Sequence, residues 1–390
     1  MKHHHGIRKT ATLYGIGIVG FFSALHLSLP TYFNSSFLST FTNGETVGLI
    51  YLIISFVTII GFLSMDYILQ KIGNLRASLI LIILQIIIFY GIITSDSFSV
   101  IAPLFILGMS VISLIGFTID VFLQKNTDLA NTGGIRGFYM TAVNTAWVLG
   151  PLLGGMFITE TNYKGVYMAA FALLFPLLYL VYKNFNNFRD THYVKFSLRG
   201  TIARILKNKD LTRIFSINIV LQTFYAWMAI YTPLYLHSNL GFSWSEIGII
   251  FTIMLLPFVL IEWPLGKLAD KKWGEKEILA IGFIIMAIST GALILFPVKS
   301  LITWSVILFI TRIGAAAAEV MIETYFFKKV DGHDPEILSM FRVTRPLSYF
   351  IAPVIVTVGL FYTTDLYLFA ILGGLCLLTL WPILRIKDTG

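Results

Sequence analysis

Long apolar runs separated by short polar connections make up most of the chain. A helix needs about 20 largely apolar residues to cross a bilayer, and twelve runs approach or exceed that length. They are residues 11–33, 46–68, 77–95, 98–122, 137–159, 165–183, 213–236, 245–265, 277–297, 300–327, 338–361 and 365–386. The pattern therefore predicts an all-α integral membrane protein with twelve transmembrane helices.

The longest connection divides these helices into two sets of six. Within it, residues 197–207 place basic and apolar side chains at helical spacing, which is typical of an amphipathic helix on a membrane surface. We therefore predict an N-terminal six-helix bundle (residues 1–183), a cytoplasmic linker with an amphipathic helix (residues 184–212) and a C-terminal six-helix bundle (residues 213–390).

Composition excludes the soluble classes of protein. The chain is 57% hydrophobic and 12% charged, whereas soluble domains carry about 25% charged residues. The single cysteine, Cys376, excludes an intramolecular disulfide and a cysteine-based metal cluster. The first apolar run is longer than that of a signal peptide, so we expect it to be kept as a helix. His3, His4 and His5 are interpreted as a tag remnant or solvated tail, and no metal or cofactor is expected.

Basic residues gather in alternate connections. The chain has 28 lysines and arginines and a formal net charge of +8. Most of them lie on one side of the membrane if both termini are cytoplasmic, as the positive-inside rule requires. We therefore expect a multi-pass protein of the plasma (inner) membrane whose basic side meets an anionic inner leaflet. Nucleic acid is not an expected partner, because there is no basic face outside these connections, and we expect a monomer.

Landmark residues recur in the two halves at a nearly constant separation. The separations lie between 202 and 204 residues for the pairs Asp66 and Asp270, Pro30 and Pro233, Asp120 and Glu323, and Pro151 and Pro353. Such a repeat predicts two pseudo-symmetric bundles in the same orientation, an arrangement of internal repeats found in transporters.

The connection from Gly266 to Lys276 reads Gly-Lys-Leu-Ala-Asp-Lys-Lys-Trp-Gly-Glu-Lys. It resembles the loop motif G-x-L-A-D-[RK]-x-G-[RK]-[RK] of the major facilitator superfamily (MFS) of secondary transporters. A stretched copy surrounds Asp66. The resemblance implies the MFS fold and a gating role, in which these aspartates and nearby bases latch the two halves. The implied gating residues are Asp66, Asp270, Lys271 and Lys272, with Asp120 and Glu323 as partners for the bases. Solvated helix ends are the alternative interpretation.

A second motif, Gly150-Pro151-Leu152-Leu153-Gly154-Gly155, is similar to a glycine–proline motif of antiporters in this superfamily. The resemblance implies proton-coupled export and adds Gly150 and Pro151 to the gating residues. Ala146 stands where the motif has an upstream glycine. The alternative is a kinked, tightly packed helix, because small residues permit close helix approach and proline bends a helix.

Ionisable residues form a stripe within the run 300–327. Arg312, Ala316, Glu319 and Glu323 follow the i, i+4, i+7, i+11 spacing of one helix face. Glu323 has Asp120 as its counterpart in the other half, whereas Arg312 and Glu319 have none. Since charges at membrane depth are costly and usually functional, Glu319 is our candidate for a proton-carrying carboxylate beside Arg312. A static buried ion pair is the alternative.

Further polar residues are candidates for the proton and substrate pathway. His26 titrates near neutral pH in its free form, and Arg345 can meet Glu319 or an anionic substrate. Each of them also has a structural interpretation, as a hydrogen-bonded packing residue or as an arginine that extends to the interface. The remaining candidates are Glu262, Asn144, Trp147, Asn218, Gln222 and Tyr225.

Enzyme motifs are missing from the sequence. It contains no H-E-x-x-H, no G-x-x-x-x-G-K-[ST] and no G-x-S-x-G, so we predict that the protein is not an enzyme. We also predict that transport is coupled to an ion gradient, because the sequence lacks an ATP-binding motif. We predict a secondary active transporter that moves a small molecule by alternating access, through proton-coupled export of an amphiphilic compound. The alternatives are uptake of a nutrient such as a sugar or organic anion, by symport or uniport, and a non-transporting membrane receptor.

Overall fold

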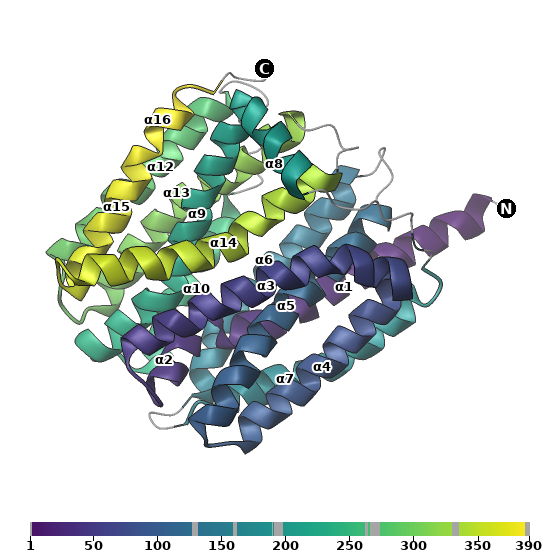
Figure 1. Ribbon diagram of the computed structural model, residues 1–390, viewed down its shortest axis with the longest axis horizontal. Helices are drawn as coiled ribbons and strands as arrows, with labels where there is room; N and C mark the ends of the chain where they lie inside the picture. Colours follow the sequence, from purple (N-terminus) through teal and green to yellow (C-terminus); the bar gives the residue numbers. More distant parts are fainter. Residues whose placement is uncertain are drawn as a thin grey trace. The chain divides into compact units, whose positions relative to one another are not determined.

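Helices account for almost all of the described chain in the computed structural model (Figure 1). The structure describes residues 2–126, 132–158, 162–188, 190, 198–261, 264–265, 274–329 and 335–386. The first half of the chain contains α1 (Lys2–Thr31), α2 (Asn34–Ser39), α3 (Gly44–Ile72), α4 (Asn74–Thr94), α5 (Phe98–Asn126), α6 (Thr132–Phe157) and α7 (Lys164–Phe185). The second half contains α8 (Leu198–Lys207), α9 (Lys209–Leu234), α10 (Trp244–Leu260), α12 (Glu275–Ala292), α13 (Leu301–Lys329), α14 (Pro335–Leu360), α15 (Leu368–Leu378) and α16 (Leu380–Ile383), with short turns η1 (Tyr235–Asn239), η2 (Leu293–Leu295) and η3 (Asp365–Tyr367).

The predicted all-α membrane fold is confirmed. Within the described residues, 10 helices are long and apolar enough to cross a membrane, and α10 adds a shorter apolar helix of 17 residues. Every predicted run overlaps one of these helices or α6. The physical reason is that a bilayer offers no hydrogen-bonding partner to the backbone, so each spanning segment must satisfy its own amide groups.

The chain divides into two compact units. The first unit comprises Met1–Phe41 and Phe56–Lys195, and the second comprises Thr42–Ser55 and Phe196–Gly390. The start of α3 therefore belongs to the second unit, where the Tyr51 ring lies 6.3 Å from the ring of Tyr349 in α14. The remainder of α3 packs in the first unit, with Met65 and Leu69 against Leu114 of α5.

Small residues allow α6 to approach α1 closely in the first unit. A Cβ atom added at Gly150 would lie 2.8 Å from the backbone carbon of Ser28, and one added at Gly154 would lie 2.5 Å from the carbonyl oxygen of Leu29. The Ser28 hydroxyl also donates to the carbonyl of Ala146 at 2.9 Å. Two glycines of the glycine–proline motif are therefore required by helix packing.

Glycines bring α13 equally close to α12 in the second unit. A Cβ atom at Gly314 would lie 2.5 Å from the carbonyl oxygen of Gly282, and one at Gly282 would lie 2.8 Å from that of Gly314. On the other side of α12, Gly373 of α15 faces the carbonyl of Ala287, and α15 and α16 run beside α12 (Figure 1). These contacts fix α13, the helix that carries Arg312 and Glu319.

Candidate functional site

The stripe of charged residues lies on α13, and the exposure of its side chains increases from Arg312 to Glu323. Arg312 is 2% exposed and Ala316 is fully buried, whereas Glu319 is half-buried and Glu323 is exposed. The periodicity of the sequence thus placed these residues on one face of a regular helix, at different depths in the unit.

Tyr225 of α9 connects directly to this stripe. Its hydroxyl donates a hydrogen bond to Glu319 Oε2 at 2.7 Å, and the carbonyl oxygen of Ala315 lies 3.4 Å from the same hydroxyl. A hydrogen bond to an ionised carboxylate is about twice as strong as one between neutral groups. The contact therefore holds the Glu319 carboxylate in one orientation on the half-buried side of α13.

Arg312 lies against two aromatic rings of α9. The centre of its guanidinium lies 5.2 Å from the ring centroid of Phe224 and 5.2 Å from that of Tyr225. Within the part of the chain that the structure describes, Arg312 Nε has no hydrogen-bond partner and no carboxylate lies within 4.0 Å of the guanidinium. Its charge is therefore held by cation–π contacts, which are strongest where the site is desolvated.

Arg312 and Glu319 do not form a direct ion pair. The ring and hydroxyl of Tyr225 contact both of them, while their charges still interact electrostatically. Arg345 of α14 is exposed and also acts on Glu319 through its charge. The geometry places a titratable carboxylate near two guanidinium groups, and among the described residues its one direct hydrogen-bond partner is the Tyr225 hydroxyl.

Asn218 of α9 has a structural partner. Its side-chain amide is 3% exposed and donates to Thr344 Oγ1 of α14 at 2.8 Å. The hydroxyl of Ser348, one turn further along α14, donates to the carbonyl of Ile219 at 3.0 Å. These bonds join α9 to α14, while Gln222 lies half-buried one turn along α9 between Asn218 and Tyr225.

In the first unit the candidate residues do not form one cluster. His26 of α1 is 1% exposed, and neither ring nitrogen has a hydrogen-bond partner of normal geometry among the described residues. Asn144 and Trp147 are half-buried on α6. None of the three occupies the cavity that the structure shows in this unit.

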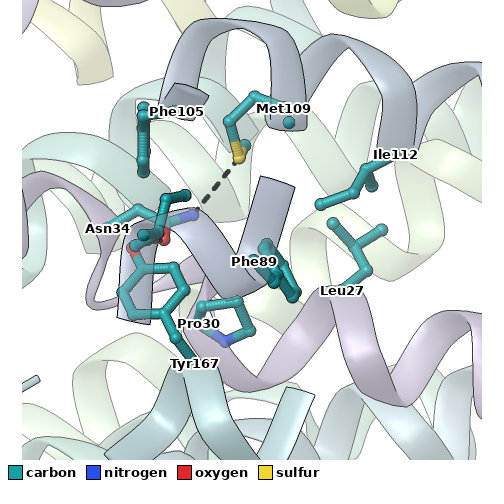
Figure 2. A pocket seen from close by; sticks show the side chains of 10 residues that line it. Leu27, Pro30, Asn34, Phe89, Phe105, Met109, Ile112 and Tyr167 are labelled. Carbon is teal, nitrogen blue, oxygen red and sulfur yellow. Dashed lines mark hydrogen bonds between the residues drawn. The ribbon is translucent and has the colours of Figure 1, made fainter. Parts of the chain in front are cut away.

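That cavity lies between α1, α2, α4, α5 and α7 and is small (Figure 2). Its volume is about 10 Å³, room for about one water molecule. Asn34 accepts a hydrogen bond from the hydroxyl of Tyr167 at 2.7 Å, and its amide points at the sulfur of Met109, 3.5 Å away. The cavity is too small for an organic substrate.

Comparison with known proteins identifies the family. Residues 130–353 and 214–389 match the model of the Major Facilitator Superfamily. The chain belongs to the Major Facilitator Superfamily. It is therefore a multi-pass membrane transporter and not an enzyme, as predicted.

Solved structures share the fold of this facilitator at low sequence identity. One is described as the crystal structure of a point mutant of the nucleoside transporter NupG, with a TM-score of 0.75, 12% identity, and coverage of 96% of this chain and 99% of that chain. A second, described as the crystal structure of nucleoside transporter NupG, has a TM-score of 0.72, 13% identity, and coverage of 96% and 100%. No curated protein matches the chain in sequence.

Three predicted gating residues of this facilitator, Asp270, Lys271 and Lys272, lie outside the described residues. The predicted pathway residue Glu262 also lies outside them. Asp66 lies on α3, which continues to Ile72 rather than ending near residue 68, and its side chain is not among those described. Pro151 is buried within α6, and Asp120 is half-buried towards the end of α5.

The turn that follows α3 has a clear physical basis. Gly73 has a φ of 79°, which a residue with a side chain rarely adopts. Directly after it, the amide of Asn74 donates to Asp190 Oδ1 at 2.8 Å, and the Asn74 side chain donates to the carbonyl of Thr118 at 3.0 Å. Asp190 therefore caps the N-terminus of α4, a contact between distant segments that sequence spacing did not reveal.

Phe224 and Thr344 are partners in the second unit that sequence reasoning missed. Each is next to a predicted residue, Tyr225 or Arg345, and each lies on a helix that packs against a predicted partner. A useful signal would have been an aromatic pair on one helix facing an arginine on another, but one sequence does not show which helices are neighbours.

Proposed function

We propose that this facilitator couples the movement of a small molecule to protons, with Glu319 as the proton-carrying carboxylate. The observation that carries the proposal is the position of Glu319, half-buried in a membrane helix with the Tyr225 hydroxyl at 2.7 Å and no direct ion pair within the described chain. A carboxylate locked in a static pair would have little freedom to exchange a proton. Glu319 instead has a neutral partner that can accommodate either protonation state.

Protonation of Glu319 removes a negative charge from the interior of the second unit. If the two conformations of an alternating-access cycle hold that proton with different strength, a difference of one pKa unit corresponds to about 1.36 kcal/mol, a tenfold bias between conformations. A proton gradient can then drive the cycle. The same argument does not apply to Glu323, because an exposed carboxylate exchanges protons with water in either conformation.

The experiment uses proteoliposomes with an imposed pH gradient and radiolabelled uridine as the probe, since the two similar structures named above are described as nucleoside transporters. We expect Glu319→Gln to abolish the pH-driven component of flux, because the amide cannot carry the proton. Glu246→Gln is the matched control. Glu246 pairs with Lys299 at 3.2 Å near the start of α10, and glutamine is also accepted in a capping box. Unchanged pH-driven flux in Glu319→Gln would refute the assignment.

The direction of transport has two candidate answers. Export was predicted from the glycine–proline motif, but the contacts of Gly150 and Gly154 with α1 explain those glycines by packing alone. Uptake of a polar nutrient is favoured by the guanidinium groups of Arg312 and Arg345 around Glu319. Comparing flux in right-side-out and everted vesicles of the same preparation separates the two.

The charge distribution supports a place in the plasma (inner) membrane with both termini cytoplasmic. The exposed basic residues Arg199, Arg204 and Lys207 of α8 would then face the anionic leaflet, which attracts such clusters. The same segment exposes the apolar side chains of Ile202 and Leu206, as a helix lying in the interface does.

A further inference from the structure

Arg312 carries a buried positive charge, and one of its N–H groups lacks a hydrogen-bond acceptor in the described part of the chain. The guanidinium is 2% exposed, and its Nε has no hydrogen-bond partner within the described residues. The rings of Phe224 and Tyr225 beside it supply no carboxylate or carbonyl acceptor for its N–H groups. A buried arginine is normally paired with a carboxylate or phosphate, because an unpaired buried charge is strongly destabilising, and guanidinium suits such groups through two parallel hydrogen bonds.

Glu319 is the carboxylate on the same face of α13 as Arg312, but it does not act as the hydrogen-bond acceptor of the Arg312 guanidinium. No ion pair within 4.0 Å joins it to Arg312. The residues are seven positions apart on α13, which corresponds to about 10 Å along the helix axis. That separation leaves the N–H groups of Arg312 available to a second acceptor on the same side as Tyr225.

The groups that act on the Glu319 carboxylate are the Tyr225 hydroxyl from α9, the Arg345 guanidinium from α14 and the Arg312 guanidinium on its own helix. On α10 the sole ionisable side chain, Glu246, binds Lys299, and on α12 Glu275 binds Lys328. The other acidic and basic residues of these helices are Lys209, Asp210, Arg213, Lys276, Glu277, Glu323, Lys329, Glu336 and Arg342.

We propose that Arg312 binds the carboxylate of a small organic anion, and that this anion and a proton on Glu319 bind cooperatively. The proposal rests on the proposed function, because it names the substrate class of the same site. An anion on Arg312 would lie within reach of the Glu319 charge, since Arg312 itself acts on Glu319 electrostatically, and two negative charges repel strongly in a medium of low dielectric constant. Protonation of Glu319 removes that repulsion, so the proton tightens anion binding.

Cooperativity of this kind is reciprocal. If the proton strengthens the binding of the anion, the anion strengthens the binding of the proton by the same factor. Both then bind to the same conformation and cross the membrane in the same direction, which makes the transporter a proton–anion symporter. Tyr225 serves both partners, since its ring faces Arg312 and its hydroxyl holds Glu319.

The test measures thermal stabilisation of the purified full-length protein by matched pairs of compounds. The probes are nicotinate with nicotinamide and benzoate with benzamide, which differ in the charge of one substituent. A ligand that binds the folded state raises its apparent stability. For the wild type we expect stabilisation by the carboxylates and none by the amides, with roughly tenfold tighter carboxylate binding at pH 5.5 than at pH 7.5.

Three variants assign the effect to residues. Arg312→Met should weaken carboxylate binding about a hundredfold, since removal of one partner of a buried charge pair has effects of that order. Ligand-free Arg312→Met should unfold at the same or a higher temperature than the wild type, because an unpaired buried charge has been removed. Arg312→Lys should retain part of the binding. Glu319→Gln should keep carboxylate binding and lose its dependence on pH.

The outcomes separate this inference from the proposed function. Equal stabilisation by the amides, no stabilisation by either carboxylate, or full carboxylate binding in Arg312→Met would overturn the anion site. Proton-driven uridine flux that requires Glu319 and is unaffected in Arg312→Met would also overturn the anion site, but it would support the proposed function. Carboxylate binding that needs Arg312, in a protein that shows no pH-driven flux of uridine or of labelled nicotinate and benzoate, would support the anion site and overturn the proposed function.

Discussion

Tyr225 contacts both charged residues of the cluster in the second unit. Its hydroxyl donates to Glu319 at 2.7 Å, and its ring centroid lies 5.2 Å from the guanidinium of Arg312. Replacing the hydroxyl alone therefore separates two interactions that most substitutions would remove together. The tyrosine ring can keep its position beside Arg312 while Glu319 loses its only direct hydrogen-bond partner in the described chain.

We expect Tyr225→Phe to reduce pH-driven flux by roughly ten- to a hundredfold, because a hydrogen bond to an ionised group contributes about 1.5–3 kcal/mol. The ring remains, so carboxylate-dependent stabilisation through Arg312 should persist. The measurement is pH-driven flux in the proteoliposome assay described above, at several imposed pH gradients. Tyr231→Phe, two turns further along the same helix, is the control and should transport normally. Equal flux in the two variants would show that the Tyr225 hydroxyl has no part in coupling.

The sequence predicted the members of this cluster better than their contacts. Arg312 and Glu319 followed from helical periodicity and from the lack of counterparts in the other half of the chain. The partners did not follow, because Tyr225 and Phe224 lie on α9 and reach α13 only through the packing of separate helices. Spacing along one helix is fixed by its geometry, whereas the choice of neighbouring helix depends on all of them.

At the scale of the helices, the apolar runs were sufficient to locate the spans, since chain length and hydrocarbon thickness are linked. The ends were less predictable. The run 11–33 is divided between α1 and α2, where the proline at position 30 removes a backbone donor, and α3 continues to Ile72 before the glycine turn. Close contacts between helices were foreseen only where glycines formed a motif, as at Gly150 and Gly154.

Gly373 and Gly374 offer a direct test of close packing between helices. A Cβ atom at Gly373 would lie 2.8 Å from the carbonyl oxygen of Ala287 in α12, whereas one at Gly374 meets nothing within 4 Å. We expect Gly373→Ala to destabilise the protein by about 1–3 kcal/mol through overpacking. Gly374→Ala should be neutral or stabilising by up to about 1 kcal/mol, because alanine favours helices.

Thermal unfolding of the two purified variants in the same detergent provides the measurement. The residues are adjacent on α15, so local helix propensity and detergent effects are shared and cancel in the comparison. If both variants unfolded at the same temperature, close contact between α12 and α15 would not be required for stability.

At the scale of the whole molecule, the family and the membrane fold follow from different evidence. The run length and charge pattern predicted a membrane protein, the recurring landmark residues predicted an internal repeat, and the match to residues 130–353 and 214–389 established the family. The substrate does not follow from either. Proteins that share this fold at 12% and 13% identity are described as nucleoside transporters, and at that distance the binding residues of each protein have to be argued from its own side chains.

Orientation in the membrane is the remaining whole-molecule property that the charge pattern predicts. The single cysteine, Cys376, is fully buried, so a Cys376→Ser background permits labelling of introduced cysteines alone. Ser97 lies exposed between α4 and α5, and Ala203 lies exposed on α8 among basic residues. We expect a membrane-impermeant maleimide to label Ser97→Cys in intact cells and Ala203→Cys only in everted vesicles. The reverse pattern would place the basic connections outside and contradict the positive-inside argument, and it would also invert the direction assigned to any proton-driven flux.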